Sequence, residues 1–357
     1  MNLNDIDSLG QNNFPKWEKL EASLSTIFSN RYYTNHGPFT QKLESTVEEL
    51  LEVKHAIAMT NDAIALVISA KALNLSGKVI CSPFISPSAL NSLYWNNLTP
   101  IVCEVDEQTL AIKTSTIEHY IDDEVSAILG NHLMMEADEA KALQEIAKKN
   151  NIKLYFDARS SFGEKLNNVK IGSFGALEVF SFSQSELING AESAIVCTND
   201  DELAKKIRNI RSSYGAGEVV SVPITGNGRI SEAQAAIALL SIEDMDKNRE
   251  RNILQHAHYA QCFSQMKGFN IVNSSDNEDK NYSSIVVKVE NLTLSPNLKN
   301  IKITSPFNHG INHNFQNKVI EHNLNNSLFI NVPVGNHIDK IKIDAICNTL
   351  EKASIQK

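Results

Sequence analysis

The chain lacks the features that mark secreted, membrane-bound or nucleic-acid-binding proteins. Its five cysteines are widely scattered and include no CxxC pair, which encodes neither a disulfide framework nor a zinc knuckle. We therefore expect reduced, buried thiols and no metal site. The net charge of -9 comes with no run of lysines or arginines. Nucleic-acid and anionic membrane partners are disfavoured, because both need clustered positive charge.

Targeting signals and long apolar segments are also missing. Residues 1–14 contain neither a basic nor an apolar signal region, and the longest apolar region is interrupted at Thr60, Asn61 and Asp62. We expect neither a signal peptide nor a membrane span, and hence a cytoplasmic protein. Neither a GxSxG elbow nor a GxxxxGKS phosphate loop is present, so hydrolase and NTPase functions have no support.

The composition is that of an ordinary folded protein. With 357 residues, 42% of them hydrophobic, the chain is long enough for roughly two domains. Short runs of β-branched or aromatic residues alternate with helical patterns, and this alternation predicts an α/β domain with a mostly parallel, seven-stranded sheet. The runs begin at His55, Lys78, Pro100, Ser126, Lys153, Glu178 and Ser193.

The C-terminal part has a different pattern. A helix that opens at a capping box of Ser231 and Gln234 is expected to bridge to it, before the charged stretch DMDKNRERN. Shorter strands follow at 282–290, 300–304 and 327–334, with a closing helix over 337–353. We expect a large α/β domain with an N-terminal arm at 1–245 and a small α+β domain at 246–357. The pair His309 and His313 predicts a loop rather than a metal site.

Six ordered segments resemble the DegT/StrS family of nucleotide-sugar aminotransferases, over roughly residues 15 to 355. They are TNHGPFTQKLE from Thr34, VKHAIAMTNDAIAL from Val53, FDARSSFG from Phe156, KIGSFGALEVFSFS from Lys170, TND after Cys197 and GNGRISEAQAAIAL from Gly226. The resemblance implies a fold type I dimer with pyridoxal phosphate (PLP) between its two domains. It also implies keto sugars attached to nucleotides as substrates, in surface-polysaccharide or antibiotic synthesis.

Three residues match family residues that contact the cofactor. Asp157 matches the aspartate that pairs with the pyridinium nitrogen and keeps the ring an electron sink. Ser181 matches a serine that contacts the phosphate. Asn227 matches an asparagine that reaches the phosphate across the dimer interface. By resemblance, these residues imply the position of a cofactor pocket.

The family's Schiff-base lysine is replaced. Glu186 stands at its position in FSFSQSELINGAESA, and a carboxylate has no nucleophilic nitrogen with which to form an imine. In the turn that cups the phosphate, Asn61 is followed by Asp62 and Ala63 where the family has a glycine and a hydroxyl residue. We expect Asp62 to accept the N–H groups at the helix start itself and to repel a phosphate.

Three further positions depart from the family pattern. Ser86 replaces the aromatic residue that stacks on the cofactor ring, and Ser160 replaces a glutamine. Arg159 replaces a small residue and brings a guanidinium close to Asp157. We expect Arg159 to form a charge network with Asp157, Glu186 and Asp62.

These departures predict a protein of nucleotide-sugar and polysaccharide metabolism that cannot transaminate by the usual route and holds no cofactor. Such a pseudoenzyme would bind a nucleotide sugar, or pair with an active paralogue, as a homodimer or heterodimer. The alternative is a sugar-modifying enzyme, dehydratase-like or an aminotransferase, with noncovalent PLP or pyridoxamine phosphate (PMP) and Glu186 as base. A displaced lysine among Lys165, Lys170 and Lys205 is the least supported reading.

Overall fold

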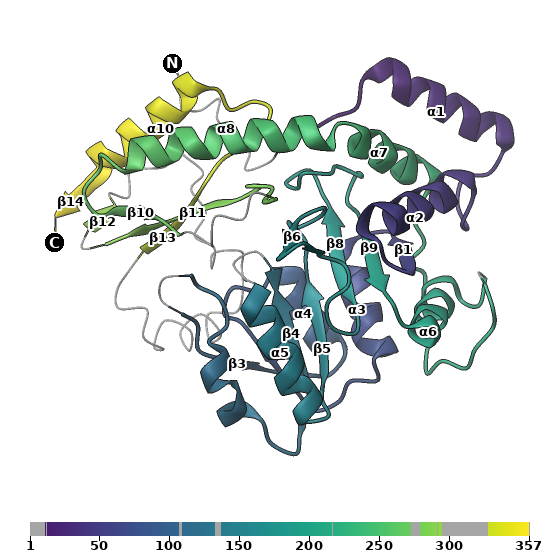
Figure 1. Cartoon of the computed structure of the whole chain (residues 1–357). Coiled ribbons are helices and arrows are strands. Elements are labelled where there is room, and N and C mark those ends of the chain that lie inside the picture. The colour runs from purple at the N-terminus through teal and green to yellow at the C-terminus, as the bar shows by residue number, and fades with distance from the viewer. Residues whose placement is uncertain are drawn as a thin grey trace.

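The computed structural model describes residues 11, 13–106, 109–132, 137–215, 217–272, 279–290, 292–294 and 328–356. Among the helices in these ranges, none is both long and apolar enough to cross a membrane. Within the N-terminal two thirds of the chain, strands and helices alternate around one sheet (Figure 1).

The elements of this part follow the predicted strand positions closely. The helices are α1 (Trp17–Asn30), α2 (Pro38–Leu51), α3 (Asp62–Ala72), α4 (Pro87–Trp95), the 3-10 helix η2 (Thr114–Tyr120), α5 (Ala137–Lys149), α6 (Asp201–Ser212) and α7 (Glu232–Glu243). The strands of the main sheet are β1 (His55–Met59), β2 (Lys78–Cys81), β3 (Thr99–Val102), β4 (Val125–Asn131), β5 (Lys153–Asp157), β8 (Glu178–Phe182) and β9 (Ser193–Thr198). A small hairpin joins β6 (Lys165–Leu166) to β7 (Val169–Lys170).

The sheet has seven strands in the order β1-β9-β8-β5-β4-β2-β3, which confirms the predicted α/β fold. Strands β8, β5, β4, β2 and β3 pair in parallel, and β9 runs antiparallel to both β8 and β1. In such a sheet the carboxyl ends of the parallel strands meet at one edge, where open α/β folds bind their ligands.

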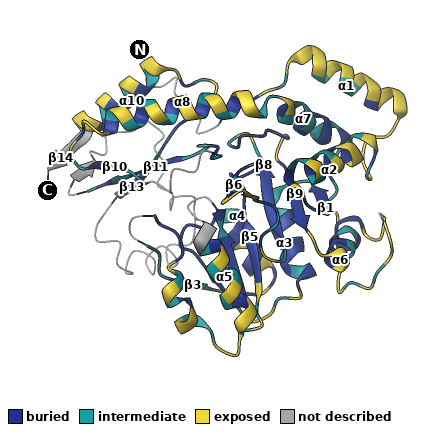
Figure 2. Cartoon of the chain, viewed as in Figure 1, coloured by how far each residue is buried: buried dark blue, intermediate teal, exposed yellow. Residues whose placement is uncertain are grey.

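Both faces of the sheet are covered. Ile128 and Leu129 are adjacent on β4 and belong to different apolar clusters, one on each face. Helices α2 and α5 contribute to the first cluster, whereas α3, α4 and α6 contribute to the second. Except for the edge strand β3, the strands of the main sheet are mostly buried, as Figure 2 shows, which explains why they are largely apolar in the sequence.

The C-terminal part forms a second apolar core. Helix α8 (Met245–Phe263) and helix α10 (Lys340–Ala353) pack against an antiparallel sheet of β10 (Phe269–Ile271), β11 (Ile285–Val289) and β13 (Leu328–Val332). Strands β12 (Leu292–Leu294) and β14 (Ser354–Gln356) form a separate pair. The predicted strand at 300–304 and the pair His309 and His313 lie outside the described residues. The predicted domain boundary at 245 stays a prediction.

Two expectations for this part need correction. The charged stretch DMDKNRERN is helical, because α8 begins at Met245, directly after the residue Asp244 that ends α7. Helix α8 and not α7 therefore makes the long connection to the C-terminal part (Figure 1). The five cysteines are free, but Cys262 on α8 is only half-buried, whereas the other four are buried as expected.

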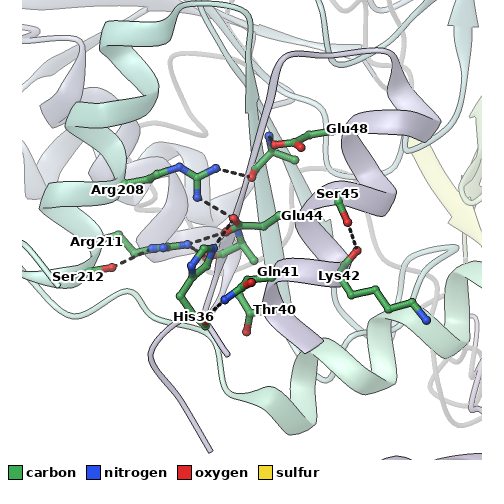
Figure 3. A network of polar contacts seen from close by, with 12 residues as sticks. His36, Thr40, Gln41, Lys42, Glu44, Ser45, Glu48, Arg208, Arg211 and Ser212 are labelled. Atoms are coloured by element: carbon green, nitrogen blue, oxygen red, sulfur yellow. Dashed lines mark hydrogen bonds and ion pairs between the residues drawn. The ribbon is translucent and has the colours of Figure 1, made fainter. Parts of the chain in front are cut away.

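A buried ionic network ties α2, β1 and α6 together (Figure 3). Glu44 Oε1 accepts hydrogen bonds from Arg211 Nη1 and from the backbone N–H of Ala58, both at 2.9 Å. Its Oε2 lies 2.7 Å from Arg208 Nη1 and 2.8 Å from His36 Nε2. Arg211 also donates to the Ala58 carbonyl at 2.9 Å. The end of β1 is thus fixed just before the chain enters α3.

Substituting Glu44 by glutamine tests the contribution of this network to stability. Burial alone would raise the pKa of Glu44, but the hydrogen bond with His36 and the charges of Arg211 and Arg208 lower it from 4.5 to about 2. Because the folded-state pKa is lowered, the stabilisation is complete above pH 4.5 and is lost as the pH falls toward 2. We expect E44Q to lower the free energy of unfolding at pH 7 by about 3 kcal/mol, as measured by denaturant titration.

The difference between wild type and E44Q should shrink progressively below pH 4.5. The matched control is E52Q, because Glu52 forms an exposed ion pair with Lys170 at 2.7 Å and its loss should leave the stability unchanged. A loss for E44Q that is the same at every pH would contradict this account of the network.

Candidate functional site

The predicted pocket residues lie around the carboxyl edge of the main sheet. Asp157 is the last residue of β5 and is 1% exposed. Ser86, the N-cap of α4, donates from its hydroxyl to Asp157 Oδ2 at 2.6 Å and accepts from the Ala89 N–H. The backbone N–H of Arg159 donates to Asp157 Oδ1 at 3.3 Å. A serine in place of an aromatic residue thus gives this carboxylate a hydrogen-bond donor.

The start of α3 differs from the expectation. Asn61, and not Asp62, is the N-cap, because its side-chain oxygen accepts the N–H of Ile64 at 2.8 Å. Asp62 and Ala63 lie in the first turn and are half-buried. The Asp62 carboxylate is free of the capping role and instead accepts a hydrogen bond from Arg159 Nη2. The prediction that Asp62 substitutes for a bound phosphate at the helix start is therefore wrong.

Arg159 points into the site. It pairs with Asp62 through Nη2, and its Nε lies 3.7 Å from Asp157 Oδ1. Burial alone would lower the pKa of Arg159, but the charges of Asp157, Asp62 and Glu186 outweigh it and raise that pKa. Of the expected charge network, the contacts of Arg159 with Asp62 and Asp157 are present, whereas Glu186 acts on Arg159 only through its charge.

Glu186 is 5% exposed and lies in the turn after β8. Its Oε1 accepts a long hydrogen bond of 3.4 Å from Ser185, whereas its Oε2 has no hydrogen-bond partner among the described residues. Burial raises the pKa of Glu186; the charge of Arg159 and the Ser160 hydroxyl oppose this rise, and Asp157 and Asp62 add to it. A buried carboxyl oxygen without a donor is costly unless a ligand or a proton satisfies it.

Two of the matched residues lie apart from this charge network. Ser181 is buried in β8, opposite Ala194 of β9. Asn227 is exposed, and its side-chain oxygen accepts from Arg229 Nε at 2.9 Å. The next residue, Gly228, accepts the backbone N–H of Thr60 at 2.9 Å, which places this segment beside the start of α3. Among the described residues, neither one forms a hydrogen bond with Asp157 or Glu186.

The loop that carries Arg159 is anchored by the C-terminal part of the chain, which the sequence patterns did not reveal. Asn281 donates from its side chain to the carbonyls of Ser160 and Phe162, at 3.1 and 2.9 Å. Its backbone N–H donates to Glu164 at 2.6 Å, and Arg249 of α8 donates to the Gly163 carbonyl at 3.0 Å. A lone asparagine after a polar stretch carries no signal of this role in the sequence.

A cavity of about 480 Å³ adjoins this loop and was also missed by the sequence analysis. Ser160 and Ser161 line one side of it, and His256 of α8 lines another together with Tyr282. The rings of His256 and Tyr282 lie 4.1 Å apart, and burial lowers the pKa of His256. The volume falls within the range of about 300–1,000 Å³ that is typical of small-molecule sites.

His132 directly follows β4, a position from which a histidine could contact a substrate. Instead it is fully buried, with Nε2 3.0 Å from Glu178 Oε2 and its ring stacked on Phe156. The structure therefore assigns it to the core rather than to the site.

The strand order, the aspartate at the end of β5 and the helix start that faces it match the fold of the fold type I aminotransferases. The chain belongs to the DegT/DnrJ/EryC1/StrS aminotransferase family, whose pattern it matches over residues 17–308. One similar protein is the dTDP-4-amino-4,6-dideoxy-D-glucose transaminase of Shigella dysenteriae, which is 31% identical over 281 residues, or 78% of this chain and 76% of the relative.

Solved structures show the same fold. That of DesI in the presence of its TDP-sugar product superposes with a TM-score of 0.86, at 24% identity, over 97% of this chain and 92% of the other. That of the sugar aminotransferase Spr1654 of Streptococcus pneumoniae, in its PLP form, has a TM-score of 0.81 at 15% identity, over 95% and 97% of the two chains.

The expectation that this chain holds no cofactor is wrong when set against these comparisons. Membership of an aminotransferase family, together with a related structure in its PLP form, favours PLP or PMP over no cofactor. The physical error lay in expecting Asp62 to cap α3 and to repel a phosphate, although its pairing with Arg159 was itself expected. In the structure Arg159 neutralises Asp62, so the start of α3 is less hostile to a dianion than the sequence suggested.

The residues of the site fit such a cofactor without a covalent bond. Asp157 accepts two hydrogen bonds, which leaves room for a further donor on a carboxylate with about four acceptor positions. Glu186 Oε2 is a buried acceptor that still lacks a donor among the described residues. The backbone N–H groups in the first turn of α3 point toward the N-terminal end of the helix, where they favour an anion.

A double-mutant cycle on D62N and R159M tests whether the two charges act as a pair. Each single substitution leaves the other charge without its partner, whereas the double substitution removes both. We expect a coupling of about 1–2 kcal/mol in the free energy of unfolding. The same cycle on the exposed pair Glu118 and Lys149, 2.6 Å apart, should give a much smaller coupling. Equal couplings in the two cycles would show that Arg159 is not held by Asp62.

Proposed function

We propose that this chain modifies nucleotide sugars with PLP or PMP held noncovalently, and that Glu186 is its acid-base residue. The observation that carries the proposal is the buried Oε2 of Glu186, which has no donor among the described residues. A carboxyl group whose pKa is raised by burial can hold a proton nearer to neutral pH and release it to a reacting group. In an inactive protein, the free-energy cost of burying this acceptor without a donor would not be offset by any function.

Each charged residue has a distinct role in this proposal. Asp157, oriented by the Ser86 hydroxyl, would accept a hydrogen bond from the protonated ring nitrogen of the cofactor. Arg159 neutralises Asp62 at the start of α3, where a phosphate would lie. PLP or PMP, when bound, supplies an electron sink for bonds at the amino-bearing carbon. Glu186 would transfer the proton that the family's lysine transfers in its active relatives.

The substrate class follows from the relatives and from the cavity. The Shigella relative is named for a dTDP-linked amino sugar, and DesI was solved with a TDP-sugar. We propose a thymidine-diphosphate sugar of this kind, with its sugar in the cavity lined by Ser160, His256 and Tyr282. The hydroxyl, imidazole and phenol groups there can hydrogen-bond to sugar hydroxyls.

The test uses the full-length chain with PLP and, as probe substrate, dTDP-4-amino-4,6-dideoxy-D-glucose. We expect co-elution of PLP or PMP with the wild type, and no covalent adduct by mass spectrometry after borohydride treatment. E186K should acquire such an adduct, because it restores an amine at this position. E186Q should retain the coenzyme but lose about 10²–10⁴-fold of the turnover rate, because it removes one acid-base group.

The matched control is E192Q, since Glu192 is an exposed glutamate in the turn before β9, and its turnover should equal that of the wild type. The proposal fails if neither PLP nor PMP binds to the wild type at concentrations that saturate a relative. It also fails if E186Q turns over the probe as fast as the wild type does.

We further propose that the chain works as a dimer, with a second copy rather than a paralogue as the partner. Helix α1 extends away from the sheet domain in Figure 1, and large aromatic side chains on and before it are exposed: Phe14 at 67%, Trp17 at 62% and Phe28 at 65%. Such a group of exposed aromatic residues favours a protein interface. The exposed position of Asn227 is compatible with a pocket completed by the second chain. The cytoplasmic location stays a prediction.

Light scattering after size-exclusion chromatography measures the oligomeric state. We expect the wild type to elute as a dimer and the double variant W17E/F28E to shift toward monomer, because charge at these positions opposes burial in an interface. The control for helix integrity is K19E on the same helix. This substitution changes an exposed residue that forms an ion pair with Glu243, and the variant should stay dimeric. A monomeric wild type that dimerises only with an active relative would support the heterodimer instead.

A further inference from the structure

A group of metal-binding side chains lies between α8 and α10, away from the coenzyme site. His258 and Cys262 are four residues apart on α8 and therefore lie on one face of that helix. Asp344 and Cys347 are three residues apart on α10 and likewise share a face. Helices α8 and α10 pack together on the C-terminal core, so the two pairs meet at the edge of that core.

The distances between these groups are short. His258 Nε2 lies 2.8 Å from Asp344 Oδ1, and Cys262 Sγ lies 3.7 Å from the same oxygen. One ligand atom from each of the three residues lies within 4.8 Å of the others. Cys347 lies outside this group of three, but its thiol interacts with that of Cys262, which makes it a potential fourth ligand. A tetrahedral zinc site has ligand atoms about 3.3–3.8 Å apart, given bonds of about 2.0–2.3 Å.

We propose that His258, Cys262, Asp344 and Cys347 bind a zinc ion that joins α8 to α10. Two thiolates with an imidazole and a carboxylate match the ligand preference and the coordination number of zinc. The position also suits entry of an ion, because Cys347 is buried while Asp344 is largely exposed. This proposal departs from the sequence-based expectation of no metal site.

Proton balance follows from the ligand types. Without metal, each thiol carries its proton at neutral pH, because the ordinary pKa of a cysteine thiol is about 8.5. Binding replaces those two protons by one Zn²⁺, which releases two H⁺ and leaves both sulfurs as thiolates. Affinity should therefore rise with pH. No electron is transferred, so the site needs no oxidant or reductant.

A second histidine-aspartate pair in the chain provides the matched comparison. His55 Nε2 lies 2.8 Å from Asp201 Oδ1, the same distance as in the pair on α8 and α10, and Lys54 rather than a thiol accompanies it. Of the four histidine-carboxylate contacts in the described residues, only that of His258 lies beside cysteines. The pair at His55 therefore controls for metal binding by an imidazole and a carboxylate alone.

The experiment measures metal binding to the reduced full-length chain without added coenzyme. Co²⁺ is the spectroscopic probe, and Zn²⁺ affinity is measured by competition with a chelating dye. We expect one equivalent of Co²⁺ to bind and to give a thiolate charge-transfer band. This band should disappear when Zn²⁺ displaces the Co²⁺. C262S and C347S should each weaken Zn²⁺ binding by at least about 100-fold, because loss of a direct ligand costs more than loss of an outer partner. D201N should bind as the wild type does.

Two results would overturn the proposal. One is a cobalt spectrum without a thiolate band, or with a band that persists in the double variant C262S/C347S. The other is a reduced wild type with no more zinc affinity than that double variant. This result would overturn the proposal even if the two thiols form a disulfide in air. Circular dichroism of each variant shows whether it is folded. D344N, which removes only an exposed ligand, gives a second test, and we expect it to weaken Zn²⁺ binding by about tenfold or more.

Discussion

The burial of the main sheet on both faces is the constraint on which the rest of the structure depends. Because helices cover both faces, a polar side chain within a strand meets an apolar neighbour on either side. Ionisable groups can gather only where strands end. Asp157, Ser86 and Glu186 all follow strands at the carboxyl edge, and the chain approaches the same region through the end of β1 and the start of α3.

Two ionic networks at these strand ends differ in how completely they are satisfied. In the first, Arg208, Arg211, His36 and a backbone N–H together contact both oxygens of Glu44. In the second, Arg159 meets three carboxylates, and one oxygen of Glu186 remains without a donor among the described residues. The first network is complete and structural. The second leaves an acceptor for another molecule, which is typical of a site.

Much of the fold could be predicted from the sequence, and the reason is physical. Strands buried on both faces are largely apolar runs, which located six of the seven strands. The edge strand β3 is less buried but was found from its own β-branched residues, and the helix-opening capping box at Ser231 was found as well. At the pocket, the pairing of Arg159 with Asp62 and Asp157 was expected, but the residue that caps α3 was not. Asn61 and Asp62 are both good caps, and only tertiary contacts with Arg159 decide which of them caps α3. The direction of the Arg159 side chain is likewise set by residues distant in sequence.

Other features left no local signal. The ligands on α8 and α10 are 82 and 86 residues apart in the chain, and each helix carries only two of them. Arg159, 97 residues away, balances the charge of Asp62. This pairing was predicted, but the expectation of no cofactor did not take its neutralising effect into account.

The anchoring of the Arg159 loop affects how the molecule can be divided. Asn281 and Arg249 lie beyond residue 245, yet their hydrogen bonds hold the carbonyls of Ser160, Phe162 and Gly163. A fragment cut after α7 would retain every strand of the main sheet and still lose the supports of this loop. The sheet domain by itself is therefore not a portable binding module, and exchange of C-terminal parts between relatives must keep these two side chains with their acceptors.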